Sequence, residues 1–219
     1  MFIFVLGLEG CGHHGLSHVV KQSMKNASKS INFEVRNLRN VRESIFIGTP
    51  KELFQNQIET LSHLYRQVDC LYEDMSYPHG GRRSVASQYN ISEEYTYFAE
   101  IGKIKVLHLK RNIYNTINSH SDWDGDIINH TKVLSQIQTE SIEKELSVLR
   151  SLGVHILELE YEKINTEEGI DIITNMLEID RECVVSAVSK SFKPSKKDYR
   201  QLLASETIAQ IDEILKSNK

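Results

Sequence analysis

A glycine-rich segment near the start of the chain has the spacing of a phosphate-binding loop. It lies between an apolar run over residues 1–8 and a stretch with helical character. Glycines permit tight backbone curvature, and consecutive N–H groups at a helix N-terminus face an anion. We therefore predict that this segment binds an anionic ligand group through Gly10, Gly12, His13, His14, Gly15, Leu16 and Ser17.

Leu16 distinguishes this loop from the loop of nucleoside triphosphatases. Those proteins place a lysine immediately before the Ser or Thr, where its ammonium group reaches the terminal phosphates. In this chain the residue before Ser17 is the uncharged Leu16. The sequence therefore argues against hydrolysis of ATP or GTP.

A second candidate anchor follows a later predicted strand over residues 104–109. Arg111 comes directly after this strand, and Ser119 lies about two helical turns further along the chain. A guanidinium group can bind two phosphate oxygens at once, and a hydroxyl can donate to a third. We expect Arg111 and Ser119 to meet one anion if the helix between them folds across the strand end.

Taken together, the two segments resemble motifs of the sulfotransferase family. The family's first loop has the form Gly-x-x-Lys/Arg-Ser-Gly-Thr-Thr, and His13 stands at its basic position in this chain. The family's second motif is Arg-Asn/Asp-Pro-x-Asp-x-x-x-Ser, which Arg111 and Ser119 match, with Ile113 in place of proline and Asn115 in place of aspartate. In that family the arginine and the serine hold the 3′-phosphate of the donor.

This resemblance implies an enzyme that moves a sulfonyl group from 3′-phosphoadenosine 5′-phosphosulfate (PAPS) to a hydroxyl or amine, leaving adenosine 3′,5′-bisphosphate (PAP). The acceptor would be a small molecule or a glycan. His13 would help the leaving group to depart, and the general base would follow the strand over residues 68–75. His79 is the preferred base and Glu73 an alternative; Asp74 and His14 remain open.

Two further segments match the family less specifically. Tyr161 and Glu162 follow the last predicted strand, as a Tyr-Glu-Asp-Leu segment does in the family, and we assign them a structural role. A basic tail over residues 191–200 stands where the family often has a loop that closes over the nucleotide. Its candidate contacts are Lys193, Lys196, Lys197 and Arg200, and a solvated charge run is an equally good interpretation.

The elements predicted around these motifs define an α/β fold. Strands are predicted over residues 1–8, 68–75, 104–109 and 154–160. Helices are predicted over 15–24, from 50 to 64, from 92, over 112–120, 129–152, 166–177, 181–189 and 198–216. Alternation of strands and helices indicates a central parallel sheet flanked by helices, in a three-layer, P-loop-like fold. We predict one domain over residues 1–219.

The composition bears on the partners, the metal sites and the cell compartment to be expected. The 219 residues carry a formal net charge of −4, which argues against a nucleic-acid partner. The three cysteines are widely spaced, which predicts no metal site and no disulfide framework and favours the cytoplasm. No apolar stretch is long enough to cross a membrane, so no membrane partner is expected. Oligomeric state is left open.

Two other functions stay open on the sequence alone. A nucleotide kinase would explain the phosphate loop but not Leu16. A sulfotransferase-like protein that binds a nucleotide or a sulfated ligand without catalysis would explain His13, whose charge depends on pH.

Overall fold

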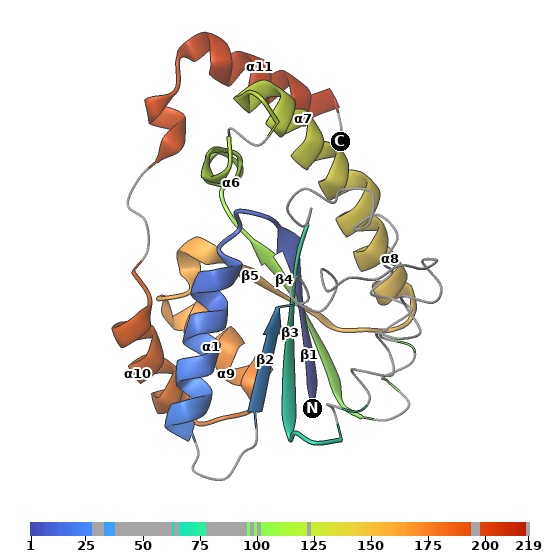
Figure 1. Cartoon of the computed structure of the whole chain (residues 1–219), viewed down its shortest axis with the longest axis vertical. Coiled ribbons are helices and arrows are strands. Elements are labelled where there is room, and N and C mark those ends of the chain that lie inside the picture. The colour runs from blue at the N-terminus through green and yellow to red at the C-terminus, as the bar shows by residue number, and fades with distance from the viewer. Residues whose placement is uncertain are drawn as a thin grey trace.

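A parallel five-stranded sheet in the order β2-β3-β1-β4-β5 forms the centre of the protein (Figure 1). The computed structural model describes residues 1–27, 33–37, 63, 66–77, 96, 99, 102–121, 124–193 and 198–217. The strands are β1 (Phe2–Leu8), β2 (Phe33–Asn37), β3 (Cys70–Tyr77), β4 (Ile104–Lys110) and β5 (Ile156–Glu160).

β1 occupies the middle of the sheet because its sequence is apolar on both faces. Every residue from Phe2 to Leu8 is buried, as expected for a central parallel strand covered on both sides. In the register of the sheet, Phe2 lies between Leu71 of β3 and Ile104 of β4. The segment that follows β1 therefore leaves the carboxyl edge of the sheet between the ends of β3 and β4.

Helices cover both faces of this sheet (Figure 1). One face carries α1 (His13–Ala27), α9 (Glu167–Leu177) and α10 (Arg181–Ser191), which pack against one another. The other face carries α7 (Ile127–Ile137), a π-helical turn over Gln138–Ile142 named η1, and α8 (Glu143–Ser151). The predicted three-layer α/β architecture with a parallel central sheet is confirmed.

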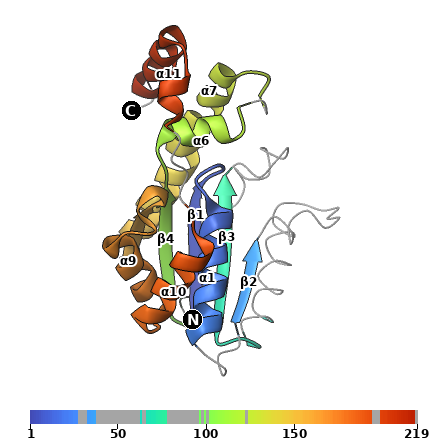
Figure 2. The same ribbon diagram turned by 90° about the vertical axis from the view of Figure 1, so that its left-hand side faces the viewer.

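A smaller group of helices lies beyond the carboxyl edge of the sheet (Figure 2). It comprises α6 (Ile113–Ser119), the 3-10 turn η3 (Tyr199–Leu202) and α11 (Ser205–Ser217). η3 packs against α6 and α11 packs against α7. The C-terminal part of the chain therefore returns to the same edge of the sheet as the glycine-rich loop.

The four predicted strands are all present, with boundaries shifted by at most a few residues. β2 was not predicted. The helix predicted over 129–152 is divided by η1, and the helix predicted over 198–216 is divided into η3 and α11. The helices predicted from 50 to 64 and from 92 lie outside the described residues, apart from three isolated positions. In the described parts of the chain, no helix has the length and apolar character needed to cross a bilayer.

Candidate anion-binding site

The glycine-rich loop is a short turn followed at once by α1. The Cys11 N–H donates to the Leu8 carbonyl oxygen at 3.0 Å, which closes a four-residue turn with Gly10 at a φ of +90°. Gly12 has a φ of +93°, and the helix begins at the next residue, His13. Positive φ is the region that glycine adopts without strain. The predicted helix start at Gly15 was therefore wrong by two residues.

This earlier helix start changes the surroundings of three predicted binding residues. Gly15 lies within the first turn of α1, the Leu16 side chain is fully buried in the core, and Ser17 Oγ donates to the His14 carbonyl oxygen at 3.2 Å. The first helical bond runs from Leu16 N–H to the Gly12 carbonyl. First-turn N–H groups have no carbonyl partner inside a helix, so those of His13, His14 and Gly15 are the donors that α1 can present to an anion.

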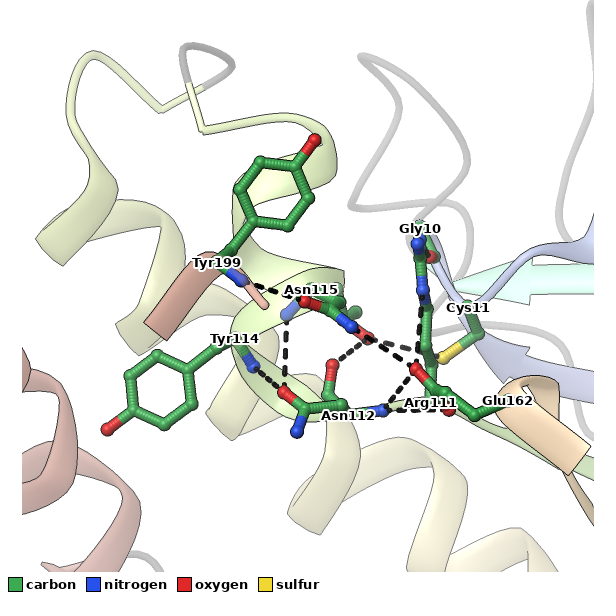
Figure 3. Close-up of polar contacts among 9 residues, drawn as sticks. Gly10, Cys11, Arg111, Asn112, Tyr114, Asn115, Glu162 and Tyr199 are labelled. Carbon is green, nitrogen blue, oxygen red and sulfur yellow. Dashed lines mark hydrogen bonds and ion pairs between the residues drawn. The ribbon is translucent and has the colours of Figure 1, made fainter. Parts of the chain in front are cut away.

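Arg111 lies at the end of β4, directly against the glycine loop. Its Nη1 donates to the Gly10 carbonyl oxygen at 2.8 Å, across 101 positions of sequence (Figure 3). Its guanidinium carbon lies 4.8 Å from the centroid of the Tyr161 ring, and its Nε lies 3.8 Å from Glu162 Oε1. Nε is buried and has no hydrogen-bond partner among the described residues. These contacts fix the orientation of the guanidinium group and leave its Nε donor without a hydrogen-bond acceptor in the described part of the chain.

Ser119 reaches the same glycine from the end of α6. A Cβ atom on Gly10 would lie 3.1 Å from the Ser119 Cβ and 2.8 Å from the Thr116 carbonyl oxygen. Only glycine fits against α6 at this position. Ser119 is exposed, so it is accessible to solvent beside the loop. The structure therefore brings together the three segments that sequence analysis selected: the loop, Arg111 and Ser119.

His13 turns its imidazole ring into the protein. Nδ1 pairs with Asp74 Oδ1 of β3, and both side chains are buried. Burial by itself lowers the pKa of His13, but the charge and hydrogen bond of Asp74 outweigh it, and the net shift is upward from 6.5. The imidazole at the position where the sulfotransferase motif has its basic residue is therefore paired with Asp74, and this pair ties α1 to β3.

The other predicted catalytic residues do not gather around His13. Asp74 faces α1, and successive side chains of a strand point to opposite faces, so Glu73 points to the opposite face of the sheet. Glu73 is fully buried there. His13 and Glu73 therefore cannot act on one reacting atom in this arrangement. His79 lies outside the described residues, and His14 is exposed on the first turn of α1.

Tyr161 is a site residue to which sequence analysis gave only a structural role. It begins the 3-10 turn η2 (Tyr161–Lys163) after β5, and its ring lies on the first turn of α1. A Cβ on Gly12 would come 2.1 Å from Tyr161 Cδ2, and one on Gly15 would come 3.1 Å from Cε2. Phe192 packs edge-on against the same ring at 5.1 Å. The position of Tyr161 directly after a strand, at the carboxyl edge of the sheet, was the available signal.

Glu162 links Arg111 to the start of α6. Its carboxylate oxygens accept from Asn112 N–H at 3.3 and 3.4 Å and from Asn115 Nδ2 at 3.3 Å (Figure 3). The Asn115 side-chain oxygen accepts from Tyr199 N–H at 3.3 Å. Asn115 thus uses both ends of its amide. An aspartate, the residue of the family motif, would place a second carboxylate against Glu162.

The basic tail contributes through Arg200 in a different way from the one expected. Arg200 Nη2 pairs with Asp212 Oδ2 at 3.1 Å, and its guanidinium carbon lies 5.2 Å from the Tyr114 ring centroid. The Tyr114 hydroxyl donates to Asp212 Oδ1 at 2.6 Å. Arg200 therefore helps to fasten η3 and α11 to α6. Lys193 is exposed, and Lys196 and Lys197 lie outside the described residues.

Comparison with known proteins gives likenesses in structure. No protein-family model matches the sequence, and no curated protein matches it. The structure is similar to the crystal structure of mouse sulfotransferase SULT7A1 complexed with PAP, with a TM-score of 0.48 and 12% sequence identity. The alignment covers 99% of this chain and 84% of that chain. A likeness at this level transfers no residue role, so the site is interpreted from its own geometry.

Within the described residues no three His, Cys, Asp or Glu side chains gather as metal ligands.

The contact between Gly12 and Tyr161 predicts an unequal response to alanine. Gly12→Ala adds both backbone strain and a collision with the ring, so we expect a loss of about 3 kcal/mol in the free energy of unfolding. Gly125→Ala is the matched control, because Gly125 has a φ of +87° but open space around it. It should lose only about 1 kcal/mol. Urea denaturation measures both values, and equal losses would contradict the predicted ring contact.

The His13–Asp74 pair predicts a pH-dependent contribution to stability. Because the pKa of His13 is raised on folding, this contribution is full below the unfolded pKa of about 6.5 and is lost as pH rises through the folded pKa. His13→Gln and Asp74→Asn should each cost about 3 kcal/mol near pH 6 and less near pH 9. Urea denaturation of both variants between about pH 6 and pH 9 measures this loss in the free energy of unfolding. The two variants should follow the same pH dependence, and a cost that grows toward pH 9 would contradict the assignment.

Proposed function

We propose that the protein binds a nucleotide of the adenosine 3′,5′-bisphosphate type at the carboxyl edge of β1 and β4, and that it transfers a sulfonyl group from PAPS to a hydroxyl or amine. The observation that carries this proposal is the convergence on Gly10. Arg111 donates to its carbonyl oxygen, and Ser119 packs against its Cα. Open parallel sheets bind ligands at this edge, where the loops after neighbouring strands meet.

The donors around Gly10 suit a ligand with two anionic groups. One group would receive the first-turn N–H groups of α1, which carry the positive end of the helix dipole. The other would lie between the Arg111 guanidinium group, whose Nε has no hydrogen-bond partner among the described residues, and the exposed Ser119. The 5′ and 3′ phosphates of one nucleotide supply such a pair of anions. The sulfotransferase motifs assign the 3′-phosphate to Arg111 and Ser119.

PAPS would bring to this site a sulfur atom already activated by its bond to the 5′-phosphate. In the transfer, a bond forms between sulfur and the acceptor oxygen or nitrogen as the bond between sulfur and the 5′-phosphate oxygen breaks. The acceptor proton passes to a base, and PAP leaves with the bridging oxygen. The contribution of this chain is positioning and charge stabilisation by α1 and Arg111. His79 remains the proposed base and His14 the alternative on the described residues.

A non-catalytic nucleotide-binding protein is the second candidate. It is favoured by His13, whose charge pairs with Asp74 inside the protein instead of facing the loop. A nucleotide kinase is disfavoured because the residue at the lysine position, Leu16, has its side chain buried in the core. Transfer of labelled sulfonyl from PAPS across a panel of hydroxyl and amine acceptors separates the enzyme from the binder. No turnover on any acceptor, with PAP binding intact, would favour the binder.

Isothermal titration with PAP tests the site itself. Arg111→Ala should weaken PAP binding by about 10- to 100-fold, because a charged hydrogen-bonded pair contributes about 1.5–3 kcal/mol. Ser119→Ala should weaken it by about fivefold, the effect of a single hydroxyl contact. Arg111→Lys should fall between wild type and alanine, since it retains the charge but loses the fork geometry.

Two controls match these variants in chemistry. Arg150→Ala removes an exposed arginine from α8, and Ser189→Ala removes an exposed hydroxyl from α10. Both should leave PAP affinity within about twofold, because long-range charge effects are screened by salt. An equal effect of Arg111→Ala and Arg150→Ala, or tighter binding of ATP than of PAP, would overturn the proposed site.

A further inference from the structure

The carboxylate of Glu162 lies among the polar groups that an oxyanion would use. Asn112 N–H and Asn115 Nδ2 donate to it, and Nε of the Arg111 guanidinium group lies 3.8 Å from its Oε1 (Figure 3). They come from the end of β4 and the start of α6, whereas Glu162 comes from η2, 50 positions away from Asn112. Charged and amide donors that converge in this way form a pocket for phosphate or sulfate oxygens.

Glu162 is held loosely in this pocket. Its hydrogen bonds measure 3.3 to 3.4 Å and its ion pair with Arg111 measures 3.8 Å. Charge-assisted hydrogen bonds are ordinarily about 2.7–2.9 Å long. The Glu162 side chain is also 38% exposed, so it can turn into solvent without moving buried groups. A tetrahedral anion with more oxygen atoms could satisfy the same donors at shorter range.

Asn115 is the residue type that such a pocket requires. Its amide nitrogen faces the carboxylate, and its oxygen is used by Tyr199 N–H. A neutral donor at this position can bind either Glu162 or a phosphate. Aspartate would repel both. The same argument gives a reason for this departure from the family motif.

We propose that the pocket of Arg111, Asn112 N–H and Asn115 is an anion-binding site whose internal occupant is Glu162, and that a phosphate group of the ligand displaces the Glu162 carboxylate. The protein thereby suppresses its own affinity for anions until a ligand with enough phosphate oxygens competes. Identifying that phosphate as part of a nucleotide rests on the proposed function, but the competition itself does not.

Titration with inorganic phosphate tests the competition without the nucleotide. Glu162→Gln removes the competing charge and keeps the size of the side chain, so it should bind phosphate about fivefold more tightly than wild type, the effect of one weak ion pair. Glu160→Gln is the matched control, because it removes the same charge from an exposed residue that pairs with Lys163 outside the pocket. It should bind phosphate within about twofold of wild type.

The double variant Arg111→Ala, Glu162→Gln should lose the gain in phosphate affinity. This loss would show that the gain arises in this pocket. Equal or weaker phosphate binding by Glu162→Gln than by wild type would overturn the inference, and so would a gain that survives loss of Arg111. Failure of the proposed function has a different signature: PAP then binds no more tightly than phosphate in every variant, whether or not Glu162→Gln gains affinity.

If Glu162→Gln does not fold, the wild-type protein can be used to test the same inference. Phosphate added to nitrogen-15-labelled protein should shift the resonances of the Asn112 backbone amide and the Asn115 side-chain amide. The inference would be overturned if phosphate shifted the resonances of first-turn amides of α1 but not those of the Asn112 backbone amide and the Asn115 side-chain amide.

Discussion

The hydrogen bond from Arg111 to the Gly10 carbonyl oxygen ties the end of β4 to the turn after β1, and the geometry of the site depends on it. A largely buried guanidinium group is costly unless its charge and donors are satisfied. Here the Gly10 carbonyl, the Tyr161 ring and the Glu162 carboxylate surround it from three segments of the chain. Satisfying Arg111 therefore brings β1, β4 and η2 together at one edge of the sheet.

Close approach of backbone segments makes the glycines of the loop structural requirements as well as conformational ones. Gly10 admits α6, and Gly12 admits the Tyr161 ring. The loop motif is therefore explained partly by packing, in addition to any ligand. The two explanations are compatible, because the same packing holds Ser119 and Arg111 beside the first turn of α1.

The charges around the loop are nearly balanced, which limits how strongly it can attract an anion. His13 pairs with Asp74, and Arg111 faces Glu162. The buried Glu9, in the turn after β1, adds a negative charge that also raises the pKa of His13. Affinity would then depend on directed N–H donors and on the movement of Glu162 more than on net charge. Such a site discriminates by the number and placement of ligand oxygens.

Sequence patterns predicted the elements that are determined locally and missed the contacts that are not. β1 is a continuous apolar run and β4 is rich in apolar residues, so both were found, whereas β2 has five residues with only two apolar side chains and was not. The pairing of His13 with Asp74, 61 positions apart, depends on which face of β3 meets α1. The Glu162 contacts depend on where η2 lies after β5. Neither is encoded in residue spacing, although the meeting of Arg111 with the loop followed from parallel-strand topology.

The most direct test of the account is a crystal structure of the protein in complex with PAP. The account predicts the 5′-phosphate on the first-turn N–H groups of α1 and the 3′-phosphate within hydrogen-bonding distance of both Arg111 and Ser119. A bound nucleotide whose phosphates contact neither of these side chains, with the hydrogen bond from Arg111 to Gly10 unchanged, would contradict it.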